Sequence, residues 1–147
     1  MAEESKTVDQ VLDSTLESVD KAERLALDLA NESGFGEEDL DRIGMSVREC
    51  MVNAVVHGNR YNRNKNVRVR VSSNSQQLSI SIQDEGEGFE VHEVPDPLHD
   101  NNLLRHSGRG LFLMGAFMDD VSVRKASPVG TEVVLTKKIG SAAGGAQ

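Results

Sequence analysis

Residues 67–82 read Val-Arg-Val-Arg-Val-Ser-Ser-Asn-Ser-Gln-Gln-Leu-Ser-Ile-Ser-Ile, and this stretch decides the fold. Apolar side chains alternate with polar ones on both sides of Asn74 and Ser75, which interrupt the alternation. A period of two is typical of a strand with one face in the core and one in water, and Asn and Ser favour turns. The stretch therefore predicts an antiparallel hairpin with one solvated face.

Two helices are expected before this hairpin. Apolar residues recur at helical spacing from Val19 to Ala30, with Ser18 as a candidate N-cap and Gly34 as the end of the helix. The acidic residues that start at Glu37 suit the positive first turn of a second helix. That helix has one apolar face, and we expect it to end near Gly58.

The rest of the chain adds a loop, a short helix and further strands. Residues 84–107 contain Gly, Pro, His and charged residues without periodicity, and a loop of this length is usually functional or disordered. We expect a short helix over residues 108–118, a strand beginning at Val121 and a last strand over residues 131–136. With a short strand as the favoured interpretation of residues 6–16, these elements predict an α+β fold. It is a two-layer sandwich whose helices cover one face of a mostly antiparallel sheet.

Length and composition narrow the class of protein. The 147 residues suit a single domain, which we place at residues 1–140, with a flexible tail over residues 141–147. The net charge of −8 and the absence of Trp argue against direct binding to nucleic acids or to anionic membranes. Cys50 is the only cysteine, so no intrachain disulfide can form. The first residues lack the basic and apolar segments of a secretion signal, and we expect a cytoplasmic location.

Three polar residues are spaced at i, i+4 and i+8 on the second predicted helix: Glu49, Asn53 and His57. At about 100° per residue they form one strip beside the apolar face. An amide oxygen suits Mg²⁺, and a carboxylate one turn away can orient or deprotonate a hydroxyl group. The alternative interpretation is a solvated helix face with chance spacing.

Two glycine-containing turns are the other candidates for chemistry. Asp84-Glu-Gly86-Glu-Gly88 follows a predicted strand, where glycines let the backbone approach a flat ring or a phosphate and an acid can accept a hydrogen bond from an exocyclic amine. Residues 107–111, Ser-Gly-Arg-Gly-Leu, precede an apolar helix, and free N–H groups at a helix start suit phosphate oxygens. Each turn alone could be an ordinary loop. The chain has neither a P-loop motif nor a dinucleotide-binding glycine fingerprint after its first strand.

Taken in order, these segments resemble the N, G1 and G2 boxes of the gyrase and histidine-kinase ATPase superfamily, which has the Bergerat fold. The boxes are residues 49–58, the turn from Asp84 to Gly88, and residues 108–111. The stretch 102–121 is similar in particular to anti-sigma factor serine/threonine-protein kinases of the anti-sigma B and sporulation type, which are bacterial. Gly-Thr-Glu-Val at residues 130–133 matches their late turn before the final strand.

The resemblance implies a role for each matching residue. Asn53 would be the Mg²⁺ ligand, Glu49 the general base acting on a partner's hydroxyl group, and His57 a further residue of the nucleotide site. Asp84 would bind the adenine amine, with Thr131 helping through a water molecule. Gly86 and Gly88 would shape the adenine pocket. Gly108, Arg109 and Gly110 would close over the phosphates of ATP, and Leu111 would be a further residue of the nucleotide site. Residues 90–107 would form a lid over ATP.

The function implied is a Mg-ATP-dependent protein serine/threonine kinase. It would phosphorylate a STAS-domain anti-anti-sigma protein, sequester a sigma factor or another regulator in its other state, and form a homodimer. Phosphoryl transfer depends mostly on positioning and charge neutralisation, so the few residues above suffice chemically. The alternatives are an ATP-binding regulatory module without catalysis, a stand-alone catalytic domain of the histidine-kinase type, and an interaction protein that binds no nucleotide.

Overall fold

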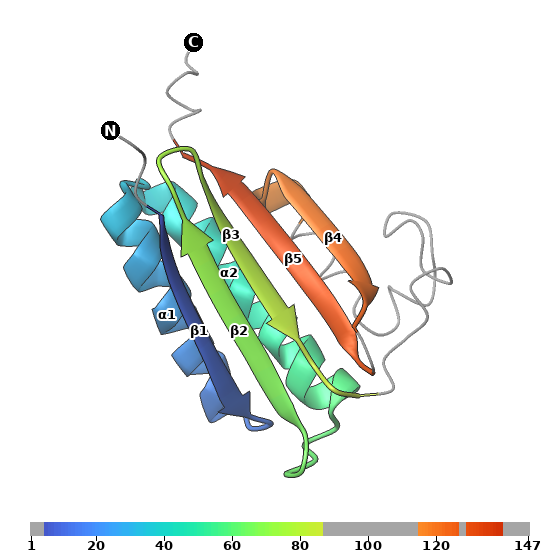
Figure 1. The fold of residues 1–147 in the computed structure, drawn as a ribbon. Helices are drawn as coiled ribbons and strands as arrows, with labels where there is room; N and C mark the ends of the chain where they lie inside the picture. Colours follow the sequence, from blue (N-terminus) through green and yellow to red (C-terminus); the bar gives the residue numbers. More distant parts are fainter. Residues whose placement is uncertain (1–4, 87–114, 127–128, 140–147) are drawn as a thin grey trace.

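The computed structural model describes residues 5–86, 115–126 and 129–139, and it contains one five-stranded sheet with its helices on one face (Figure 1). The strand order is β1-β2-β3-β5-β4, and every neighbouring pair is antiparallel. The elements are β1 (Lys6–Asp13), α1 (Glu17–Ser33), α2 (Glu37–Val52), a π-helical turn η1 (Asn53–Gly58), β2 (Asn66–Ser73), β3 (Gln77–Gln83), β4 (Asp120–Lys125) and β5 (Thr131–Lys138). The predicted α+β two-layer architecture is confirmed.

The hairpin predicted at residues 67–82 is formed by β2 and β3. Val71 lies opposite Ile80 in the register, and the side-chain oxygen of Asn74 accepts hydrogen bonds from the backbone N–H groups of Gln76 and Gln77 in the turn. The ambiguous segment before the first helix is an edge strand, β1, paired with β2. The asparagine therefore fixes the turn, and the turn fixes which side chains face the helices.

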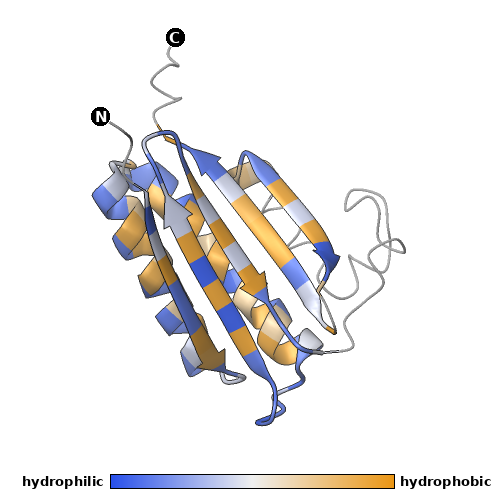
Figure 2. Cartoon of the chain, viewed as in Figure 1, coloured by the Kyte–Doolittle hydropathy of each residue, from blue (hydrophilic) through white to orange (hydrophobic). Residues whose placement is uncertain are grey.

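The core lies between the sheet and the two helices. The apolar residues of β2 and β3 are all at most 1% exposed, and they pack against buried positions of α1 and α2 such as Ala26 and Val47. Figure 2 shows the alternation along β2 as orange and blue bands. Complete burial of one Val, Leu or Ile side chain contributes about 1.5–3 kcal/mol. This alternating pattern therefore stabilises the fold that it specifies.

The first helix begins two residues earlier than the sequence indicated. Ser18 was the expected N-cap, but α1 starts at Glu17 and its N-cap is Leu16, which makes no capping bond through its side chain. Ser18 is buried inside the first turn, with its hydroxyl 3.3 Å from that of Thr15. The end of the helix was predicted correctly, because Gly34 adopts φ 100°, a left-handed conformation that glycine accepts without strain.

The second helix changes its winding before its end. The sequence predicted one regular helix from Glu37 to about Gly58, but α2 ends at Val52 and η1 follows. The N–H of Asn59 donates to the oxygen of Ala54 at 2.8 Å, an i to i+5 hydrogen bond. Such wide turns are uncommon and often occur at functional sites.

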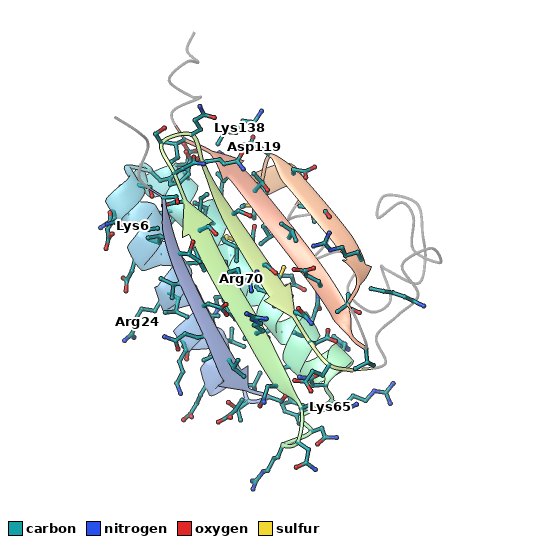
Figure 3. The ribbon with its side chains drawn as sticks, viewed as in Figure 1. Lys6, Arg24, Lys65, Arg70, Asp119 and Lys138 are labelled. Carbon is teal, nitrogen blue, oxygen red and sulfur yellow. The ribbon has the colours of Figure 1, made fainter. Side chains whose placement is uncertain are left out.

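The face of the sheet away from the helices carries a network of charged side chains. The carboxylate of Asp9 accepts hydrogen bonds from Arg68 at 2.7 and 3.0 Å and from Arg70 at 3.3 Å. Arg70 is labelled on this face in Figure 3. Further along the same face, Glu132 accepts hydrogen bonds from Ser81 and Arg124. This polar face is the solvated side that the alternation of residues 67–82 predicts.

Several sequence predictions fall outside the described residues. They are the loop and lid over residues 90–107, most of the helix predicted at residues 108–118, and the tail at 141–147. Residues 115–117 are helical, and the strands expected at Val121 and at residues 131–136 are present as β4 and β5. Within the described ranges, no helix combines the length and the apolar character needed to span a membrane.

Candidate functional site

Glu49 and Asn53 lie one turn apart where α2 passes into η1. Both are half-buried, and the backbone N–H of Asn53 donates to the backbone oxygen of Glu49. Within the described part of the chain, no other side chain or backbone group forms a hydrogen bond with either of their polar side-chain ends. The two groups are therefore held close together at the edge of the core, as the helical spacing predicted, and both can still accept a ligand.

His57 is in a different position from these two residues. The strip predicted at regular helical spacing assumes 3.6 residues per turn, but the i to i+5 bonding of η1 adds one residue to the turn. His57 is exposed, whereas Glu49 and Asn53 are half-buried. Its assignment to the nucleotide site stays a prediction.

Asp84 lies directly after β3 and is only 6% exposed. Its Oδ1 accepts hydrogen bonds from the backbone N–H of Gly86 at 3.0 Å and from that of Thr131 at 3.1 Å. Its own N–H donates to the backbone oxygen of Thr131 at 2.9 Å. Burial raises the pKa of this carboxyl above its ordinary value of 3.8, although the two N–H donors and the charge of Lys65 act in the opposite direction.

Three glycines hold the Asp84 turn against the end of η1. A Cβ atom at Gly86 would overlap the backbone oxygen of Gly58, and one at Gly58 would overlap the carboxylate of Asp84. Gly130 has φ 111°, and a Cβ atom there would overlap the backbone oxygen of Asp84. Backbone can approach backbone this closely only where side chains are missing. Gly86 was singled out as a residue of the adenine pocket, which stays a prediction, and the packing contacts of the three glycines were not predicted.

One buried oxygen beside this turn, the hydroxyl of Thr131, has no hydrogen-bond partner among the described residues, and the residue is 3% exposed. Oδ2 of the neighbouring Asp84 accepts no hydrogen bond there either. A buried polar group left unpaired costs about 1–3 kcal/mol, so the Thr131 hydroxyl indicates a missing ligand or water molecule. A carboxylate oxygen next to a hydroxyl can accept a hydrogen bond from an amine and hold a bridging water. This donor and acceptor set fits an adenine edge.

Asn59 is a buried polar residue that the sequence did not single out. Its amide nitrogen donates to the hydroxyl of Ser14 at 2.8 Å and to the backbone oxygen of Asn66 at 3.0 Å. Its amide oxygen accepts from the backbone N–H of Glu85 at 2.8 Å. The segment 59–66 contains four asparagines and reads as a turn, so nothing in its pattern marks which of them is buried.

The other predicted site residues are Gly88, Gly108, Arg109, Gly110 and Leu111, and all of them lie outside the described ranges. Among the described residues, no group of three or more His, Cys, Asp or Glu side chains could hold a metal ion. One amide such as Asn53 is nevertheless compatible with Mg²⁺, because Mg²⁺ commonly takes one or two protein ligands together with substrate phosphates and water.

Comparisons with known proteins identify the family of the chain. Residues 12–137 match the family described as the histidine kinase-like ATPase domain. The chain is 32% identical over 103 residues to an anti-sigma F factor of Clostridium acetobutylicum, covering 69% of this chain and 71% of that protein. It is 31% identical over 117 residues to the serine-protein kinase RsbW of Oceanobacillus iheyensis, covering 76% and 73%. It is 33% identical over 104 residues to the anti-sigma F factor of Bacillus subtilis, covering 69% and 71%.

A solved structure has the same fold. It is the crystal structure of the RsbU and RsbW domains of Rv1364c from Mycobacterium tuberculosis, which matches with a TM-score of 0.65 over 90% of this chain and 31% of that one. Its identity of 17% supports the fold alone. The chain belongs to the histidine kinase-like ATPase family, and the family implies that it uses ATP. The curated relatives are named as anti-sigma factors and serine-protein kinases, so the predicted resemblance is confirmed.

Proposed function

We propose that the chain binds Mg-ATP between η1 and the Asp84 turn, and passes the γ-phosphate to a serine or threonine of a STAS-domain protein. The relatives named as serine-protein kinases support the assignment as a protein serine/threonine kinase. The observation that carries the proposed site is the buried, unpartnered hydroxyl of Thr131 beside Asp84, whose Oδ2 accepts no hydrogen bond among the described residues. In this arrangement Oδ2 of Asp84 accepts a hydrogen bond from the adenine amine, and the Thr131 hydroxyl holds a water molecule beside it.

The α2 and η1 junction supplies the groups for the phosphate end of the nucleotide. The Asn53 amide oxygen would hold the metal ion, and Mg²⁺ would supply neutralisation of phosphate charge. Glu49, one turn earlier, orients the attacking hydroxyl of the partner and takes its proton. Gly108, Arg109, Gly110 and Leu111 would contact the phosphates, with Gly88 near the base.

The regulatory role proposed for this kinase is partner switching. Relatives named anti-sigma F factor support a sigma factor or a similar regulator as a second partner. Phosphorylation would add charge to the STAS-domain protein at its contact with the kinase and weaken that contact. The released kinase would then sequester the regulator. A homodimer and a cytoplasmic location belong to the same proposal.

The substitution Glu49→Gln separates this kinase from a module that binds ATP without catalysis. We expect phosphate transfer to a STAS-domain protein of the same genome to fall by about 10²–10⁴, the usual contribution of a general base. ATP binding should persist, because the amide occupies the same volume. Transfer is followed with radiolabelled ATP, and binding is followed by calorimetry.

The matched control is Glu38→Gln, an exposed residue in the first turn of the same helix. It should leave transfer unchanged. Wild-type transfer rates in Glu49→Gln would remove Glu49 as the base. Wild-type protein that binds ATP but labels no partner, nor itself, would favour the non-catalytic module. Label on a histidine would favour the histidine-kinase alternative.

A further inference from the structure

We infer that Asn59 is a positioning residue for nucleotide recognition, which holds the Asp84 turn in register with the η1 segment that carries Asn53. The inference rests on the proposed adenine site at Asp84. Asn59 touches neither reacting atoms nor the proposed ligand, and it acts through the backbone of Glu85. It is 2% exposed, and both ends of its side chain are used.

The hydrogen bonds of Asn59 join three separate parts of the chain. Its nitrogen holds Ser14, the first residue after β1, and Asn66 at the start of β2, while its oxygen holds the N–H of Glu85. The carboxylate of Glu85 also accepts a hydrogen bond from the N–H of Asn66 at 3.2 Å. Glu85 is thus tied at its backbone and at its side chain, directly beside Asp84.

The segment around Asn59 is also held in an unusual backbone conformation. Arg60 has φ 54° and Tyr61 has φ 59°, two consecutive residues other than glycine in the left-handed region. Each such residue costs about 1–2 kcal/mol, and such conformations persist where the surroundings determine them. The N–H of Tyr61 donates to the oxygen of Val55, and the N–H of Asn62 donates to the oxygen of Asn59. The chain therefore reverses tightly around Asn59 and leaves its side chain pointing at the Asp84 turn.

The two ends of the proposed site meet through this arrangement. Asn53 begins η1, and Gly58 at its other end presses on Gly86 and on the Asp84 carboxylate. The glycine contacts stop these segments from approaching further, whereas the Asn59 to Glu85 bond stops them from separating. Oδ2 of Asp84 then keeps one position relative to Asn53, so that adenine and the phosphates can be bound at once.

The test separates the acceptor of Asn59 from its donors. Asn59→Ala removes both, whereas Asn59→Asp keeps an oxygen for the N–H of Glu85 and loses the donors to Ser14 and Asn66. Ser14→Ala removes one acceptor of the Asn59 nitrogen and also the hydrogen bond from Ser14 to the backbone oxygen of Lys65, but leaves the bond to Glu85 in place. Asn62→Ala is a matched control, because Asn62 is exposed in the same segment and, among the described residues, its side chain accepts a hydrogen bond only from the N–H of Asn64. Amide hydrogen exchange of Glu85 is measured in the nucleotide-free proteins by NMR. Affinities for ATP and for ITP, whose base has an oxygen in place of the adenine amine, are measured by calorimetry.

We expect Asn59→Ala to speed exchange of the Glu85 amide and to reduce the preference for ATP over ITP by at least about fivefold, the worth of one ordinary hydrogen bond. Asn59→Asp, Ser14→Ala and Asn62→Ala should keep the slow exchange and the preference, even where the melting temperature falls. If Asn59→Ala does not fold, the same result is expected for Asn59→Ser, because the shorter serine side chain also lacks the amide group that contacts Glu85.

Unchanged exchange and unchanged preference in a folded Asn59→Ala or Asn59→Ser protein would overturn the inference. An equal loss of preference in Asn59→Asp and Ser14→Ala would overturn it too, since the effect would then follow stability and not the Glu85 bond. A wild-type protein that binds ATP and ITP equally would instead overturn the proposed adenine site. The exchange rates would still show whether Asn59 holds Glu85.

Discussion

The carboxylate of Asp84 is kept in the core at a cost to stability. Burial raises its pKa above 3.8, so the ionised form is less favourable in the folded protein than in the unfolded chain. Hydrogen bonds from the N–H groups of Gly86 and Thr131 partly offset the loss of hydration at Oδ1, while Oδ2 has no partner among the described residues. A residue that opposes folding in this way is consistent with the ligand-binding role proposed for Asp84, because stability alone would favour a neutral side chain.

The isosteric change Asp84→Asn should therefore raise the melting temperature near pH 7 while weakening nucleotide recognition. The Asn oxygen can still accept both N–H bonds, and the buried charge is gone. The gain in stability should be complete above the raised pKa and should vanish below pH 3.8, where Asp84 is protonated in both states. Preference for ATP over ITP should fall by about 10- to 100-fold, the worth of a hydrogen bond to a charged group.

Thermal unfolding across pH and calorimetry with both nucleotides measure these effects. Asp119→Asn is a control, since Asp119 is exposed and contacts Lys138 at the end of β5, whereas Asp84 contacts Thr131 at its start. A loss of stability at pH 7 in Asp84→Asn, or unchanged selectivity, would contradict the account of this residue.

At the level of elements, the hairpin could be predicted and the π-helical turn could not. The alternation of β2 and β3 has only one consistent assignment, since a slip by one residue would expose Val69 and Ile80. One wide turn at the end of a helix leaves no such signal, because Ala54 and Val55 are apolar and buried in either winding. The position of His57 was therefore the weakest part of the predicted strip.

The contact between η1 and the Asp84 turn predicts a strong effect of Gly58→Ala. Alanine has a higher helix propensity than glycine. Its Cβ at position 58 would nevertheless overlap the Asp84 carboxylate, so η1 and the Asp84 turn must move apart. We expect a net loss of about 1–3 kcal/mol in the free energy of unfolding, as for other overpacked sites. Affinity for ATP should fall as well, because Oδ2 of Asp84 moves. Urea unfolding and calorimetry measure the two losses.

The control for this glycine is Gly36→Ala at the N-cap of α2, where a Cβ would meet nothing within 4 Å. It should cost about 0.5–1 kcal/mol, because alanine is a poorer N-cap than glycine, and it should leave the affinity for ATP unchanged. Equal stability of Gly58→Ala and wild type would show that the close approach is not needed.

On the scale of the whole molecule, the sheet divides the chain into a core side and a charged side. The layers and the family could be predicted, because binary patterning and three ordered motifs extend over most of the chain. The Asn59 network could not, because it joins Ser14, Asn66 and Glu85, which are close only after the strands pair. Long-range polar contacts of this kind leave no local period in a sequence.

The charged side of the sheet should make stability depend on pH through Asp9. Hydrogen bonds from Arg68 lower the pKa of Asp9 from 3.8 to about 2, with Arg70 adding to the effect and burial opposing it. A lowered pKa contributes stability above the unfolded value and loses it as the pH falls from 3.8 to about 2. Asp9→Asn should therefore be less stable than wild type at pH 7, and the difference should shrink below pH 3.8.

Urea midpoints at a series of pH values measure this dependence. High salt should reduce the difference at pH 7, because the pair is partly exposed and screened. Asp28→Asn on the exposed side of α1 is the control, and it should show no such dependence. A constant difference between Asp9→Asn and wild type at all pH values would contradict the ionic role of Asp9.

The central claim is that one site joins Asp84 and Asn53 around Mg-ATP. It is tested most directly by calorimetric titration of the wild-type protein and Asn53→Ala with ATP, with and without Mg²⁺. The account predicts that wild type binds ATP, that removal of Mg²⁺ weakens binding, and that Asn53→Ala weakens it in Mg²⁺ but makes little difference without the metal. Absence of ATP binding by the wild-type protein at millimolar nucleotide, or equal binding by Asn53→Ala in Mg²⁺, would contradict it.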